Sequence, residues 1–426
     1  MKILDKLLIV IFWMSLCFSC TESDEFIDET PLMLKKAHVK VMPSNLPTVL
    51  EKAKEDWGNI SEALNNAGPG ETVMLGEGTF YLHKSLVCLN FNGIFKGAGM
   101  HKTIIQTAPG IIFDVGECPD LHWSWQTNGG HFMICFPHEK NDEKRIVTVS
   151  DLKFVINEPA TDWYSGSKLC NTLQAVNVHY VNLIGNPGPW YGDLSLSDQI
   201  DLNVQYKNIT VIGDQGTEYR GSGGFSVNIG LAAFGASSGT FEAKNIHMTD
   251  VYNGINPHVF CGANSLAILK NCTVKNAGST VYSFLVSGYE IKDCKCINME
   301  EQALCLCPNN LYVDYQMPVN TNSDIKDNLF ISDSPVGAFL GIKMKNVQFC
   351  DNIFKGIAKT GIYNQLGENW SIKDNNFCGL NVTHSEGVTI LLDDAKNCEV
   401  KDNWNQVVGS TVDDPSNVIS NPKDCN

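Results

Sequence analysis

Basic side chains are scarce in this sequence. Arginine occurs only as Arg145 and Arg220, and the 426 residues carry a net charge of −16. Nucleic acids are recognised by clustered cations that neutralise phosphates, so this charge balance excludes a nucleic-acid partner. A site for an acidic polymer would have to rely on lysine or on a bound cation.

Other common signatures are also missing. Leucine does not recur at the fixed offsets that heptad or leucine-rich repeats require. Cys294 and Cys296, like Cys305 and Cys307, are separated by one residue where zinc sites have two, so we assign no metal site to them. These cysteines are interpreted as small apolar core side chains. In an exported protein they indicate an anaerobic habitat or disulfides that the sequence does not reveal.

The sequence is instead organised around a recurring six-residue phrase. An apolar residue is followed by a residue that is usually Lys, then by Asn or Asp, two variable residues and a second apolar residue. The clearest copies are Ala243–Met248, Leu269–Val274, Ile291–Cys296, Ile325–Phe330, Phe349–Phe354 and Ile372–Phe377, with a weaker copy at Val400–Asn405. Copies spaced by 22 to 34 residues, each with a short strand, predict stacked coils with one repeat per coil.

The phrase also predicts local geometry. Alternation places its apolar ends inward and its Lys outward. The Asn or Asp tolerates the left-handed backbone of a tight turn, and such side chains can form amide ladders from coil to coil. A second strand precedes each copy, and stacking makes these strands one parallel sheet. On that sheet we expect Ile255 to face the core and Asn228, Asn256 and His258 to face outward, along a substrate groove.

The N-terminus has the pattern of an export signal. Residues 1–20 contain Lys2 and Lys6, a short apolar run and then Cys20, and the run is too short for a membrane span. This segment resembles a bacterial lipoprotein signal, and the acidic residues after it resemble the surface-export tag of Bacteroidetes lipoproteins. The resemblance implies lipidation of Cys20 and an outer-membrane anchor, on the cell surface or facing the periplasm. The alternative is an ordinary cleaved signal.

Residues 21–45 are polar and predict a tether, and residues 46–67 have helical periodicity that stops at Gly68-Pro69-Gly70. The helix and the strands that follow it resemble the N-terminal entry of the pectin-lyase-like superfamily. That resemblance implies an all-β, right-handed parallel β-helix with an N-terminal capping helix, over a single domain at 46–410. Residues 411–426 form a polar C-terminal tail that could close the far end of the helix.

Long inserts interrupt the coils within 116–203. They carry aromatic residues and a carboxylate, and these are the groups that stack on sugars and bind hydroxyls or Ca²⁺. The residues proposed to contact a substrate are Trp163, Tyr164, Trp190, Tyr191 and Asp193, together with Asn228 and Asn256. The alternative is that the inserts pack on themselves.

Catalysis on a polysaccharide needs two flanking carboxylates, or a base and a cation beside a uronate. The candidate catalytic residues are Asp214, Glu218, Arg220 and His258. The alternatives are a solvated turn for the first three and a structural histidine for the last. Asp393-Asp394 matches the paired aspartates of polygalacturonases, but that family's other motifs are absent, so the pair is interpreted as a strand end and turn.

The sequence therefore predicts a cell-surface, monomeric lipoprotein that binds a polysaccharide and processes it as a lyase or glycoside hydrolase, with Ca²⁺ as a candidate cofactor. The alternative is a surface lipoprotein that binds glycans or serves as a structural component without catalysis. The superfamily includes both kinds, because fold does not fix activity.

Overall fold

The computed structural model describes residues 38–114, 132–139, 144–158, 160–161, 169–170, 174–180, 201–214, 227–234, 239–258, 265–284, 286–307, 322–333, 337–384, 387–412 and 414–425. These residues form a right-handed parallel β-helix, which confirms the predicted fold class. Within these ranges no helix is long and apolar enough to cross a membrane. Residues 1–37, including Cys20, lie outside the described residues, so the export signal and anchor stay predictions.

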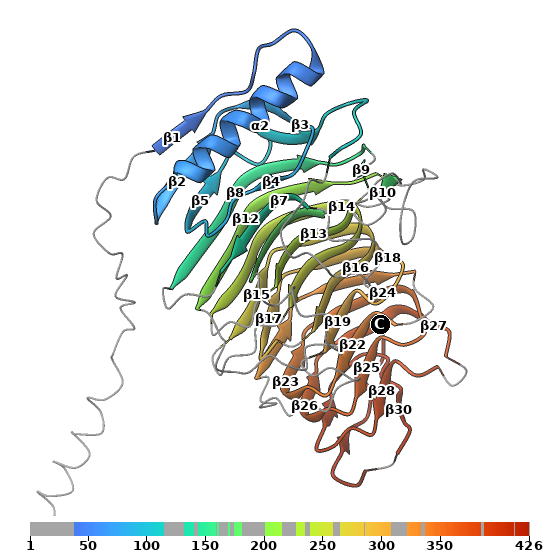
Figure 1. The fold of residues 1–426 in the computed structure, drawn as a ribbon. Coiled ribbons are helices and arrows are strands. Elements are labelled where there is room, and N and C mark those ends of the chain that lie inside the picture. Colours follow the sequence, from blue (N-terminus) through green and yellow to red (C-terminus); the bar gives the residue numbers. More distant parts are fainter. Residues whose placement is uncertain are drawn as a thin grey trace, which may run out of the picture. The chain divides into compact units, whose positions relative to one another are not determined.

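A capping helix, α2 (Val49–Asn66), precedes the coils and lies across the N-terminal strands (Figure 1). Thr48 and Glu51 form a capping box at its start, so the first backbone N–H groups have partners. Asp56 is buried, and its carboxylate accepts hydrogen bonds from the backbone nitrogens of Ser44 and Tyr81. Strand β1 (His38–Val41) pairs in parallel with the first coil, so part of the predicted tether belongs to the solenoid.

The coils stack into three parallel sheets, here called sheets 1, 2 and 3 in the order in which each coil visits them. Sheet 1 contains β2 (Glu71–Leu75), β5 (Gly93–Lys96), the first parts of β8 (Arg145–Val155), β12 (Leu202–Ile212) and β14 (Thr240–His258), then β15 (Leu266–Lys270), β17 (Tyr289–Lys292), β20 (Ser323–Lys326), β23 (Lys345–Cys350), β26 (Glu368–Lys373), β29 (Glu399–Lys401) and β31 (Val418–Ile419). Sheet 2 contains β3 (Gly78–Leu82), β6 (Thr103–Thr107), the continuations of β8, β12 and β14, the first part of β16 (Thr273–Phe284), then β18 (Lys295–Met299), β21 (Leu329–Ser332), β24 (Ile353–Ala358) and β27 (Asn376–Val382).

Sheet 3 is the sheet that the sequence predicts from the second strand of each coil. It contains β4 (Leu86–Val87), β7 (Phe132–His138), β11 (Gln174–Tyr180), β13 (Val227–Phe234), the last parts of β14 and β16, then β19 (Leu304–Cys307), β22 (Phe339–Ile342), β25 (Ile362–Gln365), β28 (Ile390–Asp393) and β30 (Val408–Ser410). A separate antiparallel pair joins β9 (Ala160–Thr161) to β10 (Leu169–Cys170). The prediction of one continuous parallel sheet is confirmed.

The Asn or Asp of the repeated phrase forms the corner between sheets 1 and 2, as predicted. The corner residues have left-handed backbones, with φ between 53° and 58°: Asp151, Asn208, Asn245, Asn271, Asp293, Asp327, Asp351, Asp374 and Asp402. The amide of Asn271 donates to Asn245 Oδ1 at 2.7 Å, and that of Asn245 donates to Asn208 Oδ1 at 2.9 Å. The predicted amide ladder is confirmed. It links coils through side chains as well as backbones.

A second, buried ladder occupies the next position of the phrase in the C-terminal coils. It consists of Asn328, Asn352, Asn375 and Asn403, and the same position is Cys272 and Cys294 in the two preceding coils. Each of the first three asparagines donates from Nδ2 to the Oδ1 of the next, at 2.9–3.0 Å. Buried amides are tolerated because their donors and acceptors are satisfied.

Phenylalanines stack along the core of the C-terminal coils, with ring centroids 4.9 Å apart for Phe330 and Phe354 and 4.7 Å apart for Phe354 and Phe377. The predicted core role is confirmed for Cys294 and Cys296, and Cys272 and Cys398 belong to the same core. Cys305 and Cys307 are also buried, but they alternate with the core residues Leu304 and Leu306 and lie outside the core. Cys350 is only half-buried. Burial raises the pKa of the Cys305 thiol to about 12, so this thiol is protonated and unreactive at neutral pH.

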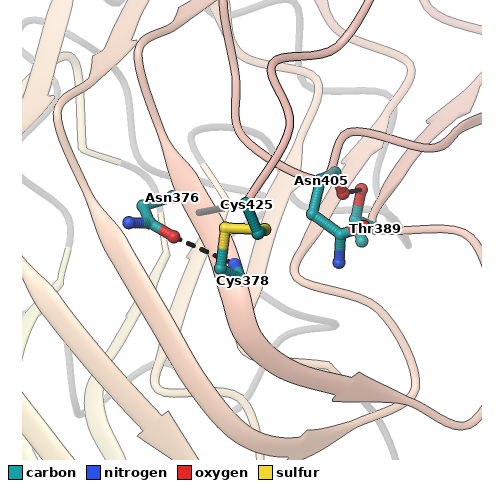
Figure 2. Close-up of a disulfide and its surroundings, with 5 residues drawn as sticks. All are labelled: Asn376, Cys378, Thr389, Asn405 and Cys425. Atoms are coloured by element: carbon teal, nitrogen blue, oxygen red, sulfur yellow. Dashed lines mark hydrogen bonds between the residues drawn. A yellow bond between two sulfur atoms is a disulfide. The ribbon is translucent and has the colours of Figure 1, made fainter.

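The C-terminal tail closes the far end of the solenoid, as the sequence suggests. β31 pairs with β29, and the backbone nitrogen of Lys423 donates to Asn403 O at 2.9 Å. A disulfide joins Cys378, in β27, to Cys425, across 47 residues (Figure 2). Beside it, Asn376 Oδ1 accepts from the backbone nitrogen of Cys378 at 2.9 Å. This disulfide is one that the cysteine pattern alone did not reveal.

Candidate functional site

The outer face of sheet 3 presents a column of side chains that are in register from coil to coil. Asn256 is in register with Tyr282 of the next coil, because the residues that precede them, Ile255 and Val281, are paired. The column then continues through Cys305, Leu340, Tyr363 and Leu391. A parallel column two residues further along each strand includes His258 and ends in Gln365 and Asp393. The accessible part of the first column lies at Tyr282, Leu340, Tyr363 and Leu391, whose side chains are half-buried.

The two predicted site residues in β14 are not exposed. Asn256 is 2% exposed and His258 is 1% exposed, so the expectation that both project into solvent is wrong. The alternation fails here because every residue from Asn253 to His258 is buried. With its amide nitrogen turned toward the strand, Asn256 donates to the backbone oxygens of Ile255 at 3.0 Å and Tyr282 at 3.2 Å. Burial lowers the pKa of His258 to about 3, so its imidazole is neutral at neutral pH.

Next to these residues lies a tyrosine–carboxylate group that the sequence analysis did not identify. Tyr252 donates from its hydroxyl to Glu301 Oε1 at 2.8 Å, across two coils. A Cβ on Gly278 would lie 2.6 Å from the Tyr252 ring, so only glycine at 278 admits the ring in this position. Burial, and then the charge of Glu301, raise the pKa of Glu300. Burial, Cys305 and Glu301 together raise the pKa of Tyr282 above its ordinary range.

A second polar group lies at the C-terminal end of the same face. The Tyr363 hydroxyl donates to Asp393 Oδ2 at 2.7 Å, and Thr411 Oγ1 donates to Asp393 Oδ1 at 2.5 Å. The hydrogen bonds from Thr411 and then Tyr363 lower the pKa of Asp393, so it is ionised at neutral pH. Burial and then the bond to Asp393 raise the pKa of Tyr363 to about 12. This carboxylate therefore fixes the Tyr363 ring and is a poor general acid.

The interpretation of Asp393-Asp394 as a strand end and turn is confirmed. β28 ends at Asp393, and Asp394 has a left-handed φ of 49°. The sequence analysis missed the role of Asp393 as the anchor of Tyr363. The available signal was the register, because Tyr363 and Asp393 sit two residues apart on adjacent strands of the predicted sheet.

Most of the other predicted site residues lie outside the described residues: Trp163, Tyr164, Trp190, Tyr191, Asp193, Glu218 and Arg220. Asp214 is exposed just after β12. Asn228 lies in β13, where its neighbours Val227 and Ile229 pair with Val251 and Asn253, so its backbone is level with Tyr252 and not with Asn256.

The second arginine of the chain, Arg145, has a structural position. It is buried, with Nη1 2.9 Å from His138 Nδ1 and in hydrogen-bonding contact with Asn90. Among the described residues no group of three or more His, Cys, Asp or Glu side chains is placed to hold a metal ion. Calcium dependence therefore stays a prediction.

The chain was compared with known families, sequences and structures. No family model and no curated protein sequence matches the chain. Solved structures with a similar fold include the A-module of a mannuronan C-5 epimerase from Azotobacter vinelandii, with 11% identity, coverage of 87% of this chain and 95% of that one, and a TM-score of 0.44. A PL6 family alginate lyase has 10% identity and a TM-score of 0.47, covering 89% of this chain, which spans half of the lyase's length.

A third is the catalytic unit of a GH87 α-1,3-glucanase from Streptomyces thermodiastaticus, with 13% identity, coverage of 91% and 70%, and a TM-score of 0.37. At these identities the likeness is one of fold and not of chemistry. The architecture itself is established by the strand pairing and register of the described residues. The chain is a right-handed parallel β-helix protein.

Proposed function

We propose that this protein binds a polysaccharide along the outer face of sheet 3, with Leu340, Tyr363 and Leu391 as the contact platform. The observation that carries the proposal is this half-exposed apolar column, bordered by Gln365 and Asp393. Neighbouring coils are about 4.8 Å apart, close to the length of one sugar ring, so each coil can offer one contact to each sugar.

The chemistry of the platform suits sugars. Pyranose rings have C–H faces that pack against aromatic and aliphatic side chains, and hydroxyls that bond to amides and carboxylates. The hydrogen bond from Tyr363 to Asp393 holds the ring before the ligand arrives. A side chain that is already ordered loses less entropy on binding, which favours affinity.

The second candidate function is catalysis, as a lyase or a hydrolase. It is favoured by the neutral His258, which lies at the middle of the same sheet on the strand next to that of Tyr282. A neutral imidazole can act as a base, and a tyrosine hydroxyl can act as an acid. Arg220 and Glu218, with the exposed Asp214, would complete such a site. The burial of His258 requires that substrate binding uncovers it.

We further propose that the protein is exported and attached to the outer membrane through a lipid on Cys20, as a monomer on the cell surface. The support is the apolar run before Cys20 and the acidic residues after it. A single chain supplies the whole platform, since all the strands of sheet 3 come from one solenoid.

The test is glycan binding by the full chain in detergent, measured by affinity electrophoresis and calorimetry against a panel of polysaccharides. We expect Tyr363→Ala to weaken binding at least tenfold and Tyr363→Phe to weaken it less, because the ring is kept. Ile268→Ala, on the outer face of sheet 1, is the matched control and should leave binding unchanged. Binding that survives Tyr363→Ala would rule out this platform.

The same samples separate binding from catalysis. A lyase would release unsaturated products that absorb in the ultraviolet, and a hydrolase would release new reducing ends. Turnover that disappears in His258→Gln, while binding persists, would establish the second function. Absence of both products under conditions where the glycan binds would leave a binding protein.

A further inference from the structure

Sheets 1 and 3 differ in the charged side chains that their strands carry. The outward lysines of the repeated phrase are in register on sheet 1, in a column that Cys350 interrupts between the fifth and sixth: Lys207, Lys244, Lys270, Lys292, Lys326, Lys373 and Lys401. In contrast, the strands of sheet 3, over the residues that the structure describes, contain no lysine and no arginine. The basic side chains of the strands are thus kept away from the proposed glycan platform.

The lysines of sheet 1 are not a free basic surface either. Lys270 Nζ lies 2.8 Å from Glu290, and Lys373 Nζ lies 2.6 Å from Glu399. Lys207 pairs with Glu242 at 3.0 Å. Like-charged neighbours about 4.8 Å apart would repel, and the interleaved acids offset much of this repulsion. The ion pairs of this column link neighbouring coils.

Within the described strands of sheet 3, the acidic side chain is Asp393, and no lysine or arginine offsets it. Asp393 is ionised, and Glu300 and Glu301 lie where sheet 2 passes into sheet 3. Two lysines of the C-terminal coils, Lys343 and Lys359, lie outside the strands of sheet 3, at the turns after β22 and before β25.

A polyuronate carries one carboxylate on every sugar. Binding it along a face with one sugar per coil requires a cation or several charge-assisted donors at each step. Without them, each carboxylate loses water with no compensation, and any that approaches Asp393 is repelled. An uncharged glycan needs only apolar contact and neutral hydrogen bonds, and these are what Leu340, Tyr363, Leu391 and Gln365 offer.

We propose that the polysaccharide bound by sheet 3 is an uncharged one, and that polyuronates are excluded by the charge of this face. The proposal rests on the proposed function and specifies its ligand class. It also favours hydrolysis over β-elimination for any catalysis, because elimination needs a uronate whose carboxylate is neutralised.

The experiment compares the affinity of the full chain for neutral probes (dextran, a β-1,3-glucan, a mannan and a galactan) with its affinity for polygalacturonate and alginate. Each is measured with calcium and with a chelator, so that a metal-bridged mode is also detected. We expect at least one neutral glycan to bind at least tenfold more tightly than both uronates. That affinity should be unchanged when salt is raised from about 0.15 M to about 1 M, which shortens the Debye length from about 8 Å to about 3 Å.

Leu391→Lys tests the cause directly, because it places a cation beside Asp393 on the platform, and Leu391→Gln is its uncharged control. We expect Leu391→Lys to gain affinity for a uronate and Leu391→Gln not to. A wild-type chain that binds a uronate more tightly than every neutral probe, with affinity falling in salt, would overturn this inference and leave glycan binding intact. A chain that binds none of the probes would overturn the proposed function, and the inference with it.

Discussion

The buried asparagine ladder gives the most exacting test of how the solenoid is held together. In Asn352, Oδ1 accepts from both the backbone nitrogen and Nδ2 of Asn328, at 3.0 and 2.9 Å. Its Nδ2 donates to Ile325 O and to Asn375 Oδ1, each at 3.0 Å. The side chain is fully buried, so water cannot replace these bonds.

Asn352→Ala would leave the Asn328 N–H and the Ile325 carbonyl without their ladder partners inside the core. Each buried polar group that loses its partner costs about 1–3 kcal/mol, so we expect a loss of about 4 kcal/mol in the free energy of unfolding. Few single substitutions cost this much. The loss should be larger than for any exposed asparagine of the same coils.

The measurement is urea unfolding followed by circular dichroism, with the slope of free energy against denaturant checked for each variant. Asn381→Ala is the matched control, because Asn381 is exposed in β27 and its removal should change stability by no more than about 0.5 kcal/mol. If Asn352→Ala costs less than about 1 kcal/mol with an unchanged slope, the ladder is not a determinant of stability and the argument fails.

Three other predictions concern the disulfide, the buried histidine and the proposed lipid anchor. Replacing Cys378 with serine opens a 47-residue loop and should lower the free energy of unfolding by about 4 kcal/mol, according to the chain-entropy relation. We expect faster proteolysis of the C-terminal tail in the variant. A proteolysis rate equal to that of the wild type would contradict this prediction. Because the folded pKa of His258 is about 3 and the unfolded one about 6.5, the unfolded chain takes up the proton first as the pH falls. The free energy of unfolding should therefore drop by up to about 1.4 kcal/mol for each pH unit between about 6.5 and 3, and His258→Gln should make that pH profile flatter. Finally, Cys20→Ser should abolish labelling by a fatty-acid analogue and release the protein from the membrane fraction, and continued labelling would refute the anchor.

The fold could be predicted because each copy of the repeated phrase contains the residues that determine its local backbone geometry. Asn271 and Asp293 stand at the same place in successive copies, and a residue tolerant of left-handed backbone at each copy indicates a corner. The capping helix was predictable from its periodicity and from the glycines that end it. These features depend only on residues that are close in the sequence, so they can be recognised without knowledge of tertiary contacts.

The buried ladder was not predicted, because Asn352 and Asn375 are asparagines, a residue type that is usually exposed. Only their stacking, with donors and acceptors matched from coil to coil, makes them stable in the core. The recurrence of Asn immediately after the corner residue in four copies was the signal for it.

The sheet that carries the candidate site could be predicted from the sequence, but the exposure of its side chains could not. Sheet 3 has the expected register, yet His258 is buried where strict alternation predicts solvent. Burial on an outer face depends on what covers it, which no local pattern specifies. Tyr363 escaped notice because its significance comes from Asp393 on the adjacent coil, 30 residues along the chain.

The two ends of this solenoid are finished by different means, α2 at one and the disulfide-bonded tail at the other, while the coils between them repeat one plan. Whole coils can therefore be added or deleted in the middle without redesigning either terminus. A change of one coil would lengthen or shorten the outer face of sheet 3 by one strand, about 4.8 Å. Under the proposed binding of one sugar to each coil, it would also change the number of sugars bound by one, and gene duplication can make such changes in whole repeats.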